Sequence, residues 1–167
     1  MRRRMGLLQP TLEEAGLASC DFVVEAVVEN LAVKQKLFAD LSRTIAPTAI
    51  LATNTSSLSI DDIGQLASRR ERLVGMHFFN PVPVMDPVEI VRGLQTSDAT
   101  VAETKQLAER MGKRAFAVND SPGFVVNRIL LPLINESIFT LQEGVAEAKT
   151  IDALMKLGCN HPMGPLE

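Results

Sequence analysis

Short apolar runs punctuate the first part of the chain and predict strands. Each run is bounded by polar, glycine or proline residues and is too short for a buried helix. The run Phe22 to Val28 is nearly all apolar, as expected of a strand covered on both faces, with Glu25 and Glu29 as the exceptions. The predicted strands are 22–28, 49–52, 73–79, 88–91 and 115–118.

Segments of helical spacing lie between these runs. Asn30 is a suitable N-cap for a first helix, and a second helix is expected over 99–111, with Gly112 just past its end. Ser59 stands three residues before Asp62, which predicts the capped start of a short helix. Strands separated by such helices predict an α/β fold with a doubly wound, mostly parallel sheet.

The pattern changes at Asn119 to Gly123, and the rest of the chain is predicted to be all-helical. Ser121 and Pro122 suit the N-cap and first position of a long helix that runs to about Glu143, with Pro132 as the expected kink. A further helix is expected over 150–157, stopped by Gly158. We therefore place a domain boundary near residue 120 and expect domains at 1–120 and 121–167.

Composition limits the kinds of partner. The chain has 167 residues, 46% of them hydrophobic, and a net charge of −3, which is typical of a globular protein and gives no reason to expect nucleic acid. The basic run Arg2 to Arg4 is interpreted as a solvated tail. No apolar run is long enough to span a membrane. Cys20 and Cys159 lie far apart and the two histidines lack ligand spacing, so we expect no metal site and a cytoplasmic protein.

His77 and Glu89 are the candidate acid–base pair. Histidine exchanges protons near neutral pH, because its unperturbed pKa is about 6.5, and a carboxylate can fix its tautomer and stabilise the imidazolium. A proline-stiffened turn between the two could bring them together. Spacing alone favours the alternative of a structural histidine. Polar groups also follow three strands at their carboxyl ends, where ligands bind in open α/β sheets: Glu29 with Asn30, Asn54 to Ser57, and His77 to Asn80.

Several long motifs in one register resemble the 3-hydroxyacyl-CoA dehydrogenase family. They are AVVENLAVKQKLF at 26–38, ATNTSSLSI at 52–60, GMHFFNPVPVMDPVEIV at 75–91, DSPGFVVNRIL at 120–130 and the terminal HPMGPLE. The resemblance implies NAD-dependent oxidation of the C3 hydroxyl of an L-3-hydroxyacyl-CoA to a ketone, as in fatty-acid β-oxidation or butanoate-type metabolism. It also implies a Rossmann-type first domain, and family members are homodimers.

The resemblance assigns a role to each candidate residue. His77 matches the catalytic base and Glu89 its partner carboxylate, while Ser56 matches a serine that contacts substrate and nicotinamide. Asn127 matches an asparagine of the helical domain that positions the substrate and the histidine. Around the nicotinamide end of the cofactor the family places the equivalents of Glu29, Lys34 and Asn80, with Lys34 also near the CoA.

Each assignment has a plainer alternative. Glu29 and Lys34 could form an ordinary helix-start pair, Ser56 could close a turn, and Asn127 could satisfy helix packing. His161 lies in a Gly/Pro turn and is interpreted as structural or solvated. A different hydroxy-acid dehydrogenase with a related two-domain plan is expected to use a lysine at the chemical step.

The family's glycine-rich phosphate turn has no counterpart in this sequence, which contains no GxG. We therefore expect an internal portion of such an enzyme: the C-terminal part of the NAD-binding Rossmann domain at 1–120, and the start of the helical substrate and dimerisation domain at 121–167. The alternative to an active enzyme is a truncated, inactive fragment that folds partly or needs a partner chain.

Overall fold

The computed structural model describes residues 6–167, and the chain divides into two compact units, Met1–Pro122 and Gly123–Glu167. The predicted basic tail, Arg2 to Arg4, lies outside the described residues. The first unit contains the sheet, and the described elements of the second unit are all helices.

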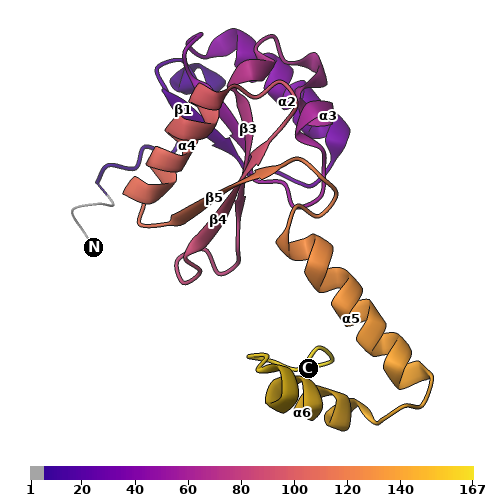
Figure 1. The fold of residues 1–167 in the computed structure, drawn as a ribbon. Coiled ribbons are helices and arrows are strands. Elements are labelled where there is room, and N and C mark those ends of the chain that lie inside the picture. Colours follow the sequence, from indigo (N-terminus) through magenta and orange to yellow (C-terminus); the bar gives the residue numbers. More distant parts are fainter. Residues whose placement is uncertain (1–5) are drawn as a thin grey trace. The chain divides into compact units, whose positions relative to one another are not determined.

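The first unit is built on a five-stranded sheet whose spatial order follows the sequence (Figure 1). The strands are β1 (Phe22–Glu25), β2 (Ile50–Thr53), β3 (Leu73–Phe78), β4 (Pro87–Arg92) and β5 (Arg114–Asn119). Neighbouring strands pair in parallel except β3 and β4, which are antiparallel. The predicted α/β fold is confirmed, with the correction that the sheet reverses direction at β4.

Helices cover both faces of this sheet, as predicted. They are α2 (Leu31–Thr44), α3 (Ile60–Ile63) and α4 (Asp98–Arg110), with short 3-10 helices η1 (Glu14–Leu17), η2 (Gly64–Leu66) and η3 (Arg70–Arg72). The expected caps are confirmed: the Asn30 side chain accepts from Val33 N, and the Ser59 side chain accepts from Asp62 N. Gly112 has a φ of 79°, the left-handed conformation expected after a helix.

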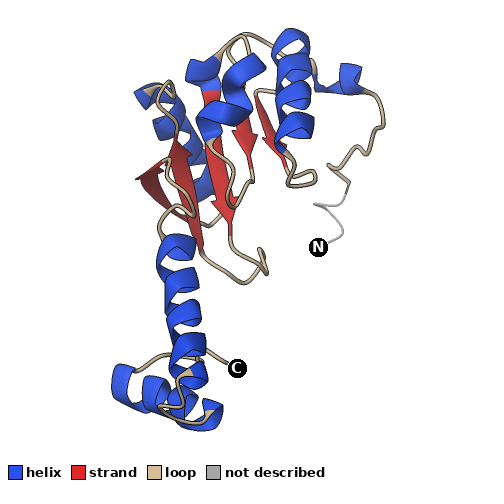
Figure 2. Cartoon of the chain, turned by 90° about the vertical axis from the view of Figure 1, so that its right-hand side faces the viewer, coloured by secondary structure: helices blue, strands red, loops and turns tan. Residues whose placement is uncertain are grey.

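The two faces of the sheet differ in character. Alternate residues of the strands form an apolar cluster with Ala108 of α4, and its strand members are Ile50, Ala52, Val74, Met76, Val88 and Ile90. The α2 and α3 helices cover the other face (Figures 1 and 2). On that face a Cβ added to Gly75 would lie 2.8 Å from Ile60 Cδ1 of α3. Because side chains alternate along a strand, His77 points to the same face as Gly75, away from the apolar cluster.

The first strand is shorter and less covered than predicted. It ends at Glu25 instead of Val28, because the Glu25 carboxylate accepts the N–H of Val27 and turns the backbone away from the ladder. Val24 is 43% exposed, so the expectation of a strand covered on both faces is wrong for the described structure.

The second unit contains α5 (Val126–Gln142) and α6 (Ala148–Cys159). The α5 helix begins at Val126 rather than at Pro122, because Gly123 and Phe124 have φ values of 75° and 50°, which a right-handed helix cannot contain. Pro132 lies inside α5. Gly158 does not stop α6; the helix ends at Cys159, and its C-cap Asn160 takes the left-handed conformation with a φ of 55°.

Candidate active site

His77 and Glu89 are brought together by the reversal of the sheet at β4. They are direct cross-strand partners of the antiparallel β3 and β4, so their side chains leave the same face. His77 Nδ1 lies 2.7 Å from Glu89 Oε2, and the two side chains are 6% and 5% exposed. An ionised carboxylate only accepts, so it orients the ring with Nδ1 donating and leaves Nε2 to face the site.

Ser56 stands at the other nitrogen of the imidazole. Its Oγ lies 3.2 Å from His77 Nε2, and the residue is exposed, whereas His77 is buried. The structure therefore places hydroxyl, imidazole and carboxylate in one line of hydrogen bonds. This is the arrangement that lets a histidine take a proton at one nitrogen while a carboxylate supports the charge at the other.

The loop that carries Ser56 is fixed by Glu29. Glu29 Oε1 accepts from Ser56 N at 3.0 Å and from Ser57 N at 3.3 Å, and it also accepts from the Thr55 hydroxyl. Burial raises the pKa of the Glu29 carboxyl, but hydrogen bonds from Thr55 and Ser56 and the charge of Lys34 outweigh it, so the pKa is lower than its ordinary value. The carboxylate form is thereby favoured at the place where it binds the loop.

Lys34 is fully buried between two carboxylates. Its Nζ donates to both oxygens of Glu25, at 2.7 and 2.9 Å, and lies 3.4 Å from Glu29 Oε2. The ammonium is buried in these contacts, and the predicted binding role of Lys34 stays a prediction. Glu29 and Lys34 are a pair, as the plainer alternative held, but Glu25 is the principal partner of the lysine.

Asn80, Asn127 and His161 come from other parts of the chain. Asn80 is exposed and lies two residues after the end of β3. The residue between them, Phe79, has its ring centroid 5.0 Å from that of the His77 imidazole. Asn127 is half-buried in the first turn of α5, in the second unit, and its predicted role beside His77 stays a prediction. The backbone N–H of His161 donates to Met155 O after the end of α6.

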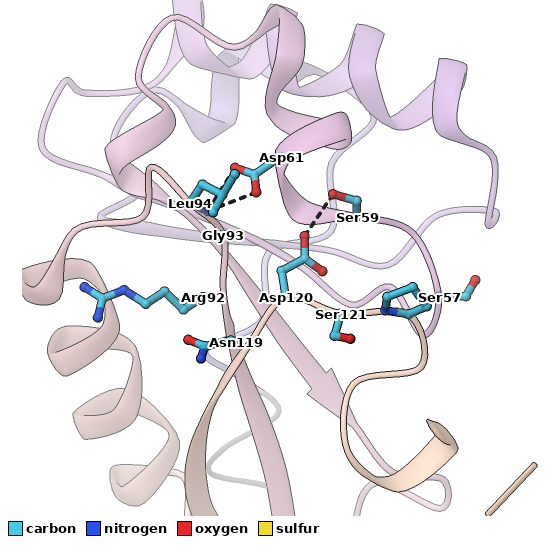
Figure 3. Close-up of a pocket in the computed structure, with 10 residues that line it drawn as sticks. Ser57, Ser59, Asp61, Arg92, Gly93, Leu94, Asn119, Asp120 and Ser121 are labelled. Atoms are coloured by element: carbon cyan, nitrogen blue, oxygen red, sulfur yellow. Dashed lines mark hydrogen bonds between the residues drawn. The ribbon is translucent and has the colours of Figure 1, made fainter. Parts of the chain in front are cut away.

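A cleft of about 530 Å³ lies near the carboxyl ends of β4 and β5 (Figure 3). Its lining includes Ser57 but not Ser56, His77 or Glu89, so it is distinct from the acid–base cluster. The carboxylates in it are used internally: Asp120 accepts from the Ser59 hydroxyl at 2.9 Å and from Ile60 N at 2.8 Å. Asp120 thereby joins the end of β5 to the start of α3.

Neither a metal centre nor a membrane segment is found over residues 6–167. No group of three or more histidine, cysteine, aspartate and glutamate side chains in that range could hold a metal ion. None of the helices in this range combines the length and the apolar character needed to cross a membrane.

Two models of known protein families match almost the whole chain. The family model described as the 3-hydroxyacyl-CoA dehydrogenase NAD binding domain matches residues 1–121, and the model of the C-terminal domain of the same enzymes matches residues 123–167. The chain belongs to the 3-hydroxyacyl-CoA dehydrogenase family. The family resemblance seen in the motifs is thereby confirmed, and the boundary between the two family models falls at Pro122 in the sequence, as does the boundary between the two compact units.

Individual 3-hydroxyacyl-CoA dehydrogenases are similar over almost all of this chain. A Bacillus subtilis (strain 168) protein named "Probable 3-hydroxybutyryl-CoA dehydrogenase" is 55% identical over 159 residues, which is 95% of this chain and 55% of that protein. The human mitochondrial hydroxyacyl-coenzyme A dehydrogenase is 46% identical over 89% of this chain and 48% of its own length. The crystal structure of the (S)-3-hydroxybutyryl-CoA dehydrogenase PaaH1 from Ralstonia eutropha matches with a TM-score of 0.90 and 49% identity, covering 93% of this chain and 55% of that one. The chain thus spans about half the length of the relatives it matches.

The motifs did not identify every residue that builds the site. Glu25 stood out only as a charged exception in an apolar strand, and no role followed from that. In the sequence Asn54 is only part of a polar stretch, yet its side chain accepts from Phe78 N at 3.1 Å and connects the loop that carries Ser56 to the end of β3. A lysine in the first turn of the next helix was the signal that could have identified Glu25 as its buried partner.

Proposed function

We propose that this chain carries the acid–base centre of an NAD-dependent 3-hydroxyacyl-CoA dehydrogenase, which oxidises the C3 hydroxyl of an L-3-hydroxyacyl-CoA reversibly to a ketone. The observation that supports this function is the line of hydrogen bonds from Ser56 through His77 to Glu89. A secondary alcohol loses a proton from oxygen and a hydride from carbon, and a buried histidine supported by a carboxylate suits the first of these transfers.

In the proposed reaction, His77 Nε2 accepts the proton of the substrate hydroxyl and returns it when the ketone is reduced. Glu89 stabilises the imidazolium through Nδ1, and the Ser56 hydroxyl, beside Nε2, orients the substrate oxygen. Asn127 and Lys34 are proposed to help position the acyl-CoA. NAD, when bound, supplies the acceptor for the hydride.

The residues at the carboxyl ends of β1 to β3 fit the nicotinamide end of that cofactor. Ser56, after β2, has an exposed hydroxyl, and Asn80, after β3, has an exposed carboxamide. Glu29, after β1, adds a partly exposed carboxylate. Such groups can bond a carboxamide and ribose hydroxyls. The buried position of Lys34 fits a role in holding Glu29 next to the cofactor.

A cytoplasmic location and a homodimeric state are also proposed. Both cysteines are free, which suits the reducing cytoplasm. A homodimer is proposed from the family, and the many exposed apolar side chains of α5 and α6, such as Ile129, Leu131 and Leu157, would suit an interface. Neither nucleic acid nor a membrane is proposed as a partner of this acidic chain.

The test is reduction of acetoacetyl-CoA by NADH, followed by the loss of NADH absorbance. The four-carbon substrate is chosen because the similar bacterial proteins are named for it. The full chain is expected to turn over, and His77→Ala is expected to lose most of the rate with its circular dichroism unchanged. An unchanged rate in His77→Ala would contradict the assignment. A chain with no turnover and no calorimetric NAD binding would instead favour the inactive-fragment alternative.

A further inference from the structure

Glu25 is a buried carboxylate to which no role has been assigned. It is 4% exposed and lies at the end of β1, where a strand residue would normally be apolar. Its two oxygens accept from Lys34 Nζ, from Val27 N at 2.6 Å and from the Thr53 hydroxyl at 2.7 Å. A carboxylate bound by an ammonium, a backbone N–H and a hydroxyl is fixed in both position and orientation.

A chain of contacts connects Glu25 to His77 through Lys34, Glu29 and Ser56. Glu25 binds the ammonium of Lys34, which lies 3.4 Å from Glu29 Oε2. The other oxygen of Glu29 accepts the N–H of Ser56 at 3.0 Å. The Ser56 hydroxyl in turn lies 3.2 Å from His77 Nε2.

Glu25 also holds the start of the serine loop directly. Thr53, which donates to its carboxylate, is the last residue of β2 and is fully buried. The backbone carbonyl of Glu25 accepts the N–H of Asn54 at 2.8 Å. The loop that presents Ser56 therefore begins on Glu25 and is bound further along by Glu29.

We propose that Glu25 is a positioning residue for the reaction: by holding Thr53 and, through Lys34, Glu29, it keeps the Ser56 hydroxyl against His77 Nε2. This inference rests on the proposed function for its catalytic consequence, but the position of Ser56 can be measured without turnover. When the charge of Glu25 is removed, Lys34 keeps one carboxylate, Glu29, as its partner. The buried ammonium then draws Glu29 inwards and the loop moves with it.

The test compares Glu25→Gln with Glu103→Gln in the full chain. Glu103 is the matched control, because it is also a glutamate in an ion pair, but its side chain is 52% exposed and its partner, Arg72, lies outside the loop that carries Ser56. Glu25→Gln is expected to lower kcat for acetoacetyl-CoA reduction by up to about tenfold, no more than the loss expected for removing the Ser56 hydroxyl itself. Glu103→Gln is expected to leave the rate unchanged.

A double-mutant cycle with Ser56→Ala separates positioning from general destabilisation. If Glu25 acts through Ser56, Glu25→Gln has little further effect on kcat in the Ser56→Ala background. If Glu25→Gln lowers kcat by the same factor in the Ser56→Ala background as in the wild type, Glu25 does not act through Ser56 and the proposal is overturned.

The readout that needs no turnover is the ¹⁵N resonance of His77 Nε2. Ser56→Ala shifts it by removing the hydroxyl, and Glu25→Gln is expected to shift it in the same direction, while Glu103→Gln leaves it at the wild-type value. A wild-type resonance in Glu25→Gln would refute the proposal. An inactive wild-type chain would count against the proposed function alone, since the resonance is read in either case.

A paired variant covers the case in which Glu25→Gln does not fold. Glu25→Gln with Lys34→Gln removes both charges, so no uncompensated ammonium is left in the interior. The same shift of the His77 resonance is expected, because Glu29 has lost its link to β1. The wild-type resonance in this folded pair would likewise overturn the proposal.

Discussion

Glu89 lies directly across the antiparallel ladder from His77, with Oε2 2.7 Å from Nδ1. The pairing of two strands thus brings together two residues that a loop separates in the sequence. Both side chains are almost completely buried, which protects the carboxylate from competing water. We therefore expect Glu89 to stabilise the imidazolium electrostatically as well as to orient the ring.

Glu89→Gln tests that electrostatic role. The amide can still accept from Nδ1, so the fold is expected to be retained, but the negative charge that supports the imidazolium is lost. We expect kcat to fall by about 10²–10⁴, the range for a general acid–base group. Steady-state kinetics of acetoacetyl-CoA reduction, with thermal unfolding as the check on folding, measures this; a kcat equal to that of the wild type would exclude the role.

Ser56→Ala is expected to have a smaller effect. It removes one hydrogen bond at His77 Nε2, for which a loss of roughly tenfold in kcat/KM is expected. Because Ser56 is exposed, its free energy of unfolding should change by no more than about 0.5 kcal/mol. Kinetics and urea unfolding on the same preparation test both statements, and a large loss of stability would show that the serine mainly supports the loop.

The stability of the first unit should depend on pH through Glu29. Its pKa is lower in the folded chain than the ordinary value of 4.5, so the folded state binds fewer protons than the unfolded state in that range. The stabilisation of the fold by the Glu29 carboxylate is therefore complete above the pKa of the unfolded state and is lost as the pH falls through the pKa of the folded state. Urea unfolding should show Glu29→Gln to be less stable than the wild type near neutral pH, with the difference shrinking below about pH 4.5. A difference that grows on acidification would contradict the sign of this shift.

Gly75→Ala should destabilise the site from within the sheet. A Cβ at this position would lie 2.6 Å from Val91 Cβ and 2.8 Å from Ile60 Cδ1, closer than packed atoms allow. We expect a loss of about 1–3 kcal/mol in the free energy of unfolding, as for other overpacked cores. Gly158→Ala is the matched control: a Cβ there meets nothing within 4 Å, so in α6 it should be neutral or stabilising by about 0.5–1 kcal/mol. Equal effects of the two substitutions in urea unfolding would exclude the overpacking explanation.

The sequence predicted the elements of the sheet better than the contacts that build the site. The strands and the Asn30 and Ser59 caps follow from local patterns, which act over a few residues and survive in the folded chain. The sequence predicts His77 and Glu89 only as a candidate pair, because their geometry depends on β4 running antiparallel, and periodicity does not report strand direction.

The contacts of Glu25 and the start of α5 show what local patterns miss. Lys34 is nine residues from Glu25, and whether the two meet in the interior or in solvent depends on how α2 packs against the sheet. The sequence Ser121 and Pro122 is typical of a helix start, but the left-handed backbone of Phe124 postpones the helix, and phenylalanine gives no local signal for that conformation.

The β4 strand is held by hydrogen bonds on both sides, with Glu89 opposite His77 on β3 and opposite Phe116 on β5. The loop at 79–86 can therefore change length without separating the acid–base pair. A deletion or insertion of one residue within β4 would have the opposite effect, because it turns Glu89 towards the apolar cluster and brings Val88 or Ile90 beside the imidazole. Variation in chain length is thus expected to be tolerated before Pro87 and excluded between Pro87 and Glu89.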